Sequence, residues 1–145
     1  MENTNNLKPE LSTKSKWYVP KDRYYELKYF CRMYPMYIRV RNDIYANSFN
    51  SAYIIRINSK TKKFCTRSEL VEKAADISEK CSKKIDAINK AAVETDKELS
   101  DYIVKGITEN LSYDVLKVRY NIPCSRGVYY ELYREFFWHL DKLRD

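Results

Sequence analysis

The segment from Ser68 to about Thr95 constrains the fold of this chain more than any other. Its apolar residues recur at spacings of three and four, and the positions between them are mostly charged. This pattern predicts one long amphipathic helix whose apolar stripe packs on other helices. Ser68 is its expected N-cap. The predicted stripe consists of Leu70, Ala74, Ile77, Cys81, Ile85, Ile88 and Ala92.

The rest of the chain also favours helices. The 145 residues include only two glycines and four prolines, and tight hairpin turns usually need glycine. We therefore expect an all-α fold, a helical bundle with a long central helix and a C-terminal helix-turn-helix. The predicted parts are a disordered arm at 1–16 and a single helical domain at 17–145. The domain comprises N-terminal helices at 17–48, a basic loop with room for a short strand at 49–66, central helices at 67–110 and the helix-turn-helix at 111–145.

The last third of the chain has the order helix, turn, helix. Ser112 can cap a first helix that runs through Tyr120. Asn121 suits the left-handed conformation at a helix end, and Ile122 can fill the core behind it. Ser125 can then cap a second helix. The spacing predicts a helix-turn-helix over Leu111–Leu143.

The start of the second helix is the end that enters the major groove in helix-turn-helix proteins. Arg126 suits a guanine edge or a phosphate, whereas Tyr130 and Arg134 suit phosphates. Glu131 adds an acid among these positions. The predicted DNA-binding residues are Ser125, Arg126, Val128, Tyr130 and Arg134 of the second helix, with Lys117 and Arg119 of the first.

These residues also resemble known families. Leu111–Tyr113 and Asn121–Arg126 are similar to the helix-turn-helix of sigma factor region four and of phage late-transcription activators of the RinA and ArpU kind. The wider pattern, with Arg23–Cys31 and Tyr133–Trp138, resembles uncharacterised proteins of Firmicutes phages and integrative elements. The first resemblance implies DNA binding in transcription regulation, and the second implies no activity.

The basic charge is concentrated away from the helix-turn-helix. The net charge is +7, which suits a polyanionic partner, and residues 1–66 hold 13 basic and 5 acidic side chains. Residues 111–145 hold 6 and 5. The N-terminal half is therefore expected to help neutralise a nucleic-acid backbone, although a solvated helix face would have the same composition. The expected backbone contacts are Arg32, Arg39, Arg41, Lys60, Lys62 and Lys63.

No catalytic constellation is evident, and we do not expect an enzyme or a cofactor. The four cysteines form no CxxC pair, and the only histidine is His139, so no metal site is expected. His139 is expected to be structural. The chain shows no signal peptide or membrane-length apolar run, which favours a cytoplasmic location and reduced thiols.

The sequence thus favours a DNA-binding transcriptional regulator that binds double-stranded DNA as a homodimer. The alternative is a phage-encoded interaction or inhibitor protein, of anti-CRISPR or polymerase-binding type, whose partner is a host protein or ribonucleoprotein. A third reading is non-specific nucleic-acid binding by the N-terminal half. Loss of sequence-specific DNA retention on Arg126→Ala would favour the first of these.

Overall fold

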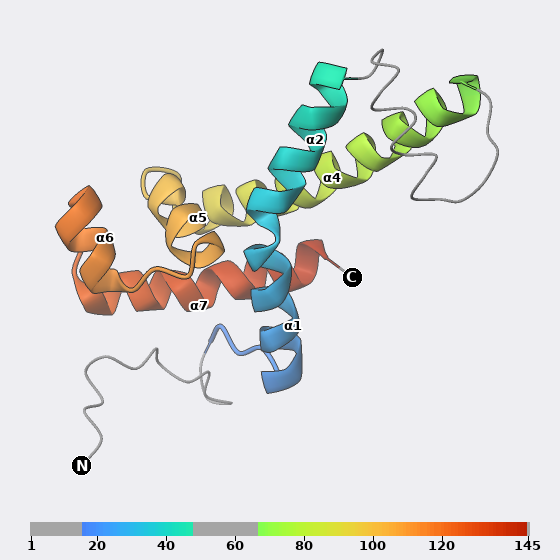
Figure 1. Ribbon diagram of the computed structural model, residues 1–145. Coiled ribbons are helices and arrows are strands. Elements are labelled where there is room, and N and C mark those ends of the chain that lie inside the picture. Colours follow the sequence, from blue (N-terminus) through green and yellow to red (C-terminus); the bar gives the residue numbers. More distant parts are fainter. Residues whose placement is uncertain (1–15, 48–66, 145) are drawn as a thin grey trace. The chain divides into compact units, whose positions relative to one another are not determined.

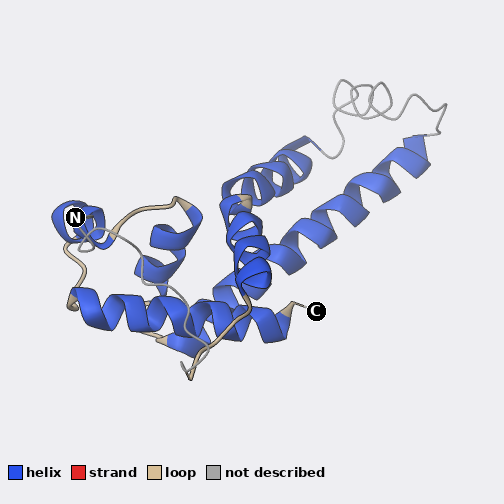
Figure 2. Cartoon of the chain, turned by 90° about the horizontal axis from the view of Figure 1, so that it is seen from below, coloured by secondary structure: helices blue, strands red, loops and turns tan. Residues whose placement is uncertain are grey.

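The computed structural model describes residues 16–47 and 67–144. Within these ranges all regular secondary structure is helical, which confirms the all-α fold class (Figure 2). The helices are α1 (Lys21–Arg32), α2 (Tyr34–Asn47), α4 (Arg67–Thr95), α5 (Ser100–Thr108), α6 (Tyr113–Tyr120) and α7 (Arg126–Leu143) (Figure 1).

The described residues fall into two compact units. One, here called the α7 unit, comprises residues 16–33 and 87–144, and the other, the α2 unit, comprises 34–47 and 67–86. The boundary between the units falls inside α4. The expectation of a single domain over 17–145 stays a prediction.

Local rules explain where the helices begin. Pro20 is the N-cap of α1, and Pro35 lies in the first turn of α2, where a missing N–H costs nothing. The long central helix is confirmed as α4. It begins at Arg67, however, so Ser68 lies inside the first turn and is not the predicted N-cap.

The core of the α7 unit is aromatic. Helix α7 packs on α1 and α5, and α5 also packs on α6. Phe136, Phe137 and Leu140 of α7 are fully buried, as are Leu27 of α1 and Ile103 of α5. Because α7 has neighbours on two sides, its buried face is wider than the single stripe that helical spacing suggests. The buried side chains of α7 are Tyr129, Tyr130, Tyr133, Phe136, Phe137 and Leu140.

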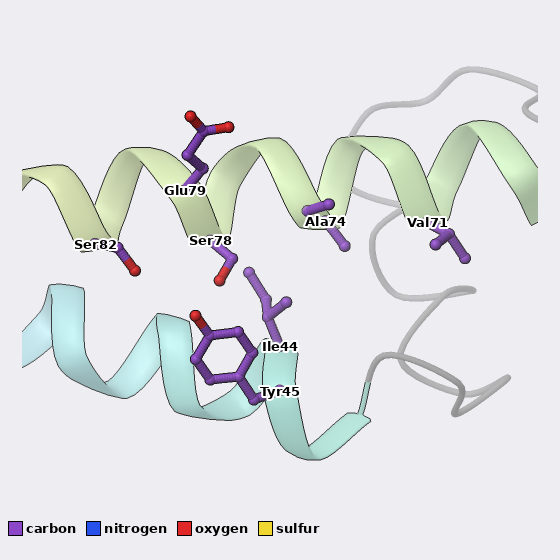
Figure 3. Close-up of a pocket in the computed structure, with 8 residues that line it drawn as sticks. Ile44, Tyr45, Val71, Ala74, Ser78, Glu79 and Ser82 are labelled. Carbon is purple, nitrogen blue, oxygen red and sulfur yellow. The ribbon is translucent and has the colours of Figure 1, made fainter.

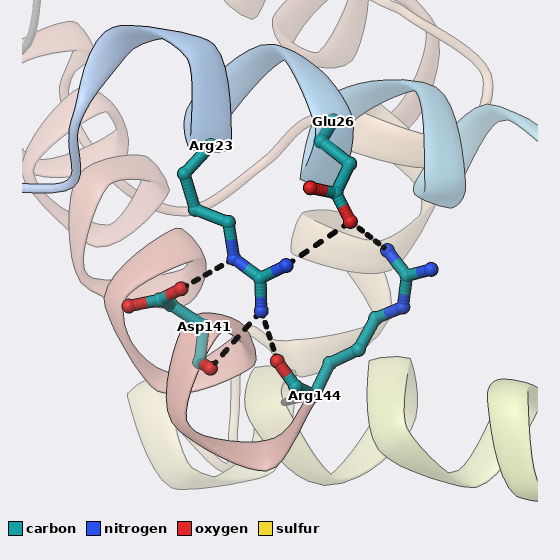
Figure 4. A network of polar contacts seen from close by, with 4 residues as sticks. All are labelled: Arg23, Glu26, Asp141 and Arg144. Atoms are coloured by element: carbon teal, nitrogen blue, oxygen red, sulfur yellow. Dashed lines mark hydrogen bonds and ion pairs between the residues drawn. The ribbon is translucent and has the colours of Figure 1, made fainter.

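A polar network joins α1 to the C-terminal end of α7 (Figure 4). Arg23 Nε donates to Asp141 Oδ1 at 2.6 Å, and Arg23 also donates to the carbonyl oxygen of Arg144. Glu26 Oε1 accepts from both Arg23, at 3.0 Å, and Arg144, at 3.2 Å. The Arg144 guanidinium also lies 4.0 Å from the Phe30 ring centroid. Thus part of the Arg23–Cys31 pattern has a structural role as the surface that α1 presents to α7.

The α2 unit is built around smaller side chains. Tyr37 and Ile44 of α2 are buried, and Lys84 Nζ lies 4.9 Å from the Tyr37 ring centroid. The prediction that Ile77 belongs to the buried stripe is wrong, because 41% of Ile77 is exposed while Ser78 is buried. Positions 77 and 78 both lie three or four residues from Ala74 and Cys81, so helical spacing alone does not distinguish between them. Its other members are buried: Leu70, Ala74, Cys81, Ile85, Ile88 and Ala92.

Some predicted features lie outside the described residues. These are the arm, apart from Lys16, the loop at 49–66 with its Tyr53–Ile57 stretch, and the basic residues Lys60, Lys62 and Lys63.

Candidate nucleic-acid interface

Both ends of helix α6 have the caps that its sequence predicts. Ser112 is the N-cap, and its hydroxyl accepts from the Val115 amide at 3.3 Å. Asn121 adopts the left-handed conformation, with φ 51° and ψ 49°. The Ile122 amide then donates back to the Leu116 carbonyl at 3.3 Å, and both side chains are fully buried. These bonds satisfy the free ends of the helix and turn the chain towards α7.

The start of α7 is also capped by a side chain, as predicted. Ser125 is the N-cap of α7, and its hydroxyl accepts from the Val128 amide at 3.3 Å. The Tyr113 hydroxyl donates to the Cys124 carbonyl at 2.6 Å, which ties the start of α6 to the turn. The helix-turn-helix shape predicted for Leu111–Leu143 is therefore present in the local geometry of α6 and α7.

Arg126 is held by two neighbours on α6. Its guanidinium forms an ion pair with Asp114 and lies 5.5 Å from the Tyr113 ring centroid. The Arg126 and Asp114 side chains are 40% and 54% exposed. An exposed ion pair contributes about 0–1 kcal/mol, so this pairing is weak enough to exchange for a phosphate or a base edge. The sequence alone does not predict that Asp114 and Tyr113 are the partners of Arg126.

The first turn of α7 presents a surface that suits an anion. Ser125, Gly127 and Val128 are exposed, and no acidic residue lies in this turn. The backbone amides at a helix N-terminus carry partial positive charge. Arg126 lies beside these amides and adds a positive charge at the start of α7.

Tyr130 does not project from α7 as predicted. Only 7% of Tyr130 is exposed, and its ring packs against Tyr129 and Tyr133 with centroid distances of 5.1 and 6.0 Å. The prediction that Tyr130 reaches a phosphate is therefore wrong. Helical spacing alone could not reveal this, because the wider buried face of α7 depends on its contacts with α1 and α5.

Arg134 and Glu131 are engaged with each other. Arg134 Nη1 pairs with Glu131 Oε2 at 3.0 Å, and the Arg134 side chain is 22% exposed. Glu131 Oε1 also accepts from Trp17 Nε1 at 3.1 Å. Glu131 thereby anchors the segment that precedes α1, and Trp17 in turn packs edge-on against Trp138 at 5.0 Å. The acid among the predicted DNA-facing residues thus has a structural role.

Helix α6 offers an exposed surface of its own. Lys117 and Arg119 are exposed, and Lys117 Nζ donates to the Ile122 carbonyl at 3.3 Å. Between them, Val118 is 84% exposed, which the sequence analysis did not identify. Tyr120 is 37% exposed, and the centroid of its ring lies 4.7 Å from Lys105 Nζ.

The basic residues expected to contact a backbone on the first two helices belong to different units. Arg32 is exposed in the α7 unit and lies 5.6 Å from the Tyr29 ring centroid. Arg39 is exposed and Arg41 is half-buried, both in the α2 unit. Each remains a predicted backbone contact by itself.

The interior of the α7 unit holds neutral tyrosines. Burial raises the pKa of Tyr129 and Tyr133 well above the ordinary range, and it also raises the pKa of Tyr24. The Tyr24 and Tyr133 hydroxyls lie 2.6 Å apart in a hydrogen bond. The Tyr129 hydroxyl is buried without a hydrogen-bond partner in the described part of the chain. These rings lie in the core of the α7 unit, where the hydrogen bond between Tyr133 and Tyr24 joins α7 to α1.

His139 lies beside two acids. Its ring nitrogens are 3.6 Å from Glu94 Oε2 and 3.4 Å from Glu135 Oε1. In residues 16–47 and 67–144, no group of three or more His, Cys, Asp or Glu side chains is arranged to hold a metal ion. No described helix combines the length and apolar character needed to cross a bilayer.

Comparison of the chain with family models, curated proteins and solved structures gives no match. The geometry of α6 and α7 is therefore the basis for a functional proposal.

Proposed function

We propose that this protein is a DNA-binding transcriptional regulator of phage or mobile-element type that acts in the cytoplasm through its α6–α7 helix-turn-helix. One observation supports this most directly. The first turn of α7 is exposed and lacks acidic residues, and the ion pair that Arg126 forms there with Asp114 is itself exposed.

The proposed binding mode follows from these positions. The start of α7 enters the major groove, where Arg126 leaves Asp114 for a guanine edge and Val128 contacts a thymine methyl group. Lys117 and Arg119 on α6 bind the flanking phosphates. The Asp114 carboxylate is then left at an exposed position, where solvation costs little.

Selection of bound duplexes from a random pool, followed by sequencing, tests the proposal with the full-length protein. We expect an enriched motif at moderate salt concentration. Arg126→Ala should abolish the enrichment, because one good bidentate base contact contributes about 1–3 kcal/mol of discrimination. Arg39→Ala removes an exposed arginine that is predicted to contact the backbone, and it is the matched control: it should lower the overall affinity but keep the motif, because phosphate contacts carry no sequence information. Failure of the parent protein to enrich any motif would overturn the proposal.

A second candidate is an interaction protein that binds a host protein or ribonucleoprotein. The exposed face of α6 favours it, because Val118 and Tyr120 are 84% and 37% exposed and together give this helix an apolar surface that suits a protein contact. Under this reading Val118→Asp abolishes capture of the host partner, and Arg126→Ala does not. Under the DNA-binding proposal, Arg126→Ala weakens duplex binding more than Val118→Asp does.

A further inference from the structure

The α2 unit contains an open apolar groove between α2 and α4 (Figure 3). Its volume is about 430 Å³. The residues that line it include Ile44 and Tyr45 of α2, with Val71, Ala75, Ser78 and Ser82 of α4. The side chains of α4 here are mostly small, so another helix could approach the α4 backbone closely.

Four of the six α4 residues that line the groove form a regular seam, to which Ala74 and Glu79 are adjacent. Val71, Ala75, Ser78 and Ser82 are spaced four, three and four residues apart. This is the spacing of a helix that packs along a second helix in a coiled-coil manner. The Tyr45 hydroxyl lies at one side of the seam in hydrogen bonds with Ser78 and Ser82, which lower the pKa of Tyr45. The polar atoms of the seam are therefore satisfied within the unit.

Charge along α4 identifies the kind of helix that fits. Residues 69–79 contain four acids and one lysine, a net charge of −3. Residues 80–86 contain three lysines and one aspartate, a net charge of +2. Two copies of this helix packed antiparallel place the acidic half of each beside the basic half of the other, whereas a parallel arrangement opposes like charges.

We propose that the groove between α2 and α4 is a self-association surface, on which α4 of a second copy of this chain packs antiparallel with two-fold symmetry. A two-fold interface presents the same patch on both partners, and a helix with opposite charges at its two ends is complementary to itself in that arrangement. The proposal does not depend on DNA binding.

The flanking charges allow the direction of packing to be tested. Glu72 and Glu79 are seven residues apart on one side of the seam, and Lys83 pairs with Glu79 at 3.2 Å within the helix. Glu72→Lys with Glu79→Lys changes the acidic half from −3 to +1 and leaves the other half at +2. Adding Lys80→Glu and Lys83→Glu changes that half from +2 to −2, so the two halves are complementary again.

Sedimentation equilibrium of the full-length protein without DNA is the measurement. We expect the parent to be a dimer. The dissociation constant of the dimer should rise at least tenfold in Glu72→Lys/Glu79→Lys and return towards the parent value in the fourfold variant. Ala75→Arg places a charge in the seam and should give a monomer. Ile77→Arg, an exposed position outside the groove, should dimerise as the parent does.

Circular dichroism separates loss of association from loss of folding, since all of the substituted side chains lie on the described surface of α4 and should leave its helix intact. A monomeric parent over the accessible concentration range would overturn the proposal, and would mean that the groove is covered by this chain itself or by a different partner. A fourfold variant that stays as weak as the twofold one would overturn the antiparallel arrangement. A dimer that retains its affinity in Ala75→Arg would place the interface elsewhere.

Discussion

The α7 unit buries large aromatic side chains, whereas the α2 unit packs α2 on α4 with mostly small ones on the α4 side. Phe136 and Phe137 are fully buried in the first, while the buried α4 residues of the second include Ala74 and Ser78. The aromatic rings fill the space between α1, α5 and α7. The small residues leave a groove open beside α2. The α7 unit can therefore fix the shape of a helix-turn-helix without a partner, and the α2 unit retains a surface that a second molecule can use.

Loss of a central ring should have the largest effect on this contrast. Phe136→Ala removes a fully buried side chain and should lower the free energy of unfolding by about 3–5 kcal/mol. Ile77→Ala in the α2 unit removes an exposed side chain and should change it by about 0.5 kcal/mol or less. Urea denaturation followed by circular dichroism measures both. Equal losses for the two variants would show that the aromatic core is not what stabilises the fold.

Alkaline pH should also distinguish the units. The buried Tyr129 and Tyr133 have raised pKa values when folded, so the unfolded chain, with pKa values near about 10, loses these protons first. The contribution of these two tyrosines to the free energy of unfolding is fully present below about pH 10. It falls by about 1.4 kcal/mol per pH unit for each tyrosine as the pH rises towards their pKa values in the folded protein. Tyr45 of the α2 unit, with its lowered pKa, should ionise while the protein is folded.

Tyrosinate absorbance and helical circular dichroism, recorded together against pH, test this order. The buried tyrosines should ionise only as the helical signal is lost. Complete ionisation of all tyrosines before any loss of the helical signal would show that the buried tyrosine rings of α7 are accessible to solvent.

Gly106 should be the next most sensitive position. A Cβ atom added there would lie 2.9 Å from Leu116 Cδ1 and closer still to the Tyr129 hydroxyl. Gly106→Ala should therefore destabilise the protein by about 1–3 kcal/mol through overpacking. The loss should be smaller in a Tyr129→Phe background, which removes the closest atom and also an unpaired buried hydroxyl.

Gly127→Ala is the matched control for this substitution. An added Cβ at Gly127 meets no atom within 4 Å, so the change should stabilise α7 by up to about 1 kcal/mol through helix propensity. A Gly106→Ala cost that is unchanged by Tyr129→Phe would show that Leu116 alone sets the limit on space.

The helix caps should have the smallest effects on stability and the most specific effects on function. Ser112→Ala and Ser125→Ala should each lower the free energy of unfolding by about 1 kcal/mol. Ser125→Asp keeps a capping oxygen and should preserve stability, but it places a negative charge at the start of α7 and should weaken duplex binding. Thermal denaturation and fluorescence anisotropy measure the two properties. Unchanged DNA affinity in Ser125→Asp would argue against entry of this end into the groove.

Local chemistry explains which features the sequence predicted well. The caps at Ser112, Asn121 and Ser125 depend on hydrogen bonds within a few residues, and the structure confirms all of them. The burial of Tyr130 and the exposure of Ile77 depend on which helices lie alongside, and both were predicted wrongly.

The partners of the candidate site residues were harder to predict. Trp17 reaches Glu131 over 114 residues of sequence, and Arg23 reaches Asp141 over 118. No periodic pattern encodes contacts at such separations. Arg126 can be identified from its position at the helix start, but its pairing with Asp114 depends on how the turn between α6 and α7 brings the two side chains together.

The central claim, that α7 reads duplex DNA through Arg126, is tested most directly by the affinity ratio between a selected duplex and its scrambled counterpart, measured against salt concentration for the parent protein and Arg126→Ala. We expect the parent to prefer the selected duplex, and Arg126→Ala to reduce that preference by about tenfold or more while the salt dependence changes by no more than about one phosphate contact. Equal affinity of the parent for the two duplexes, or a preference that survives in Arg126→Ala, would contradict the claim.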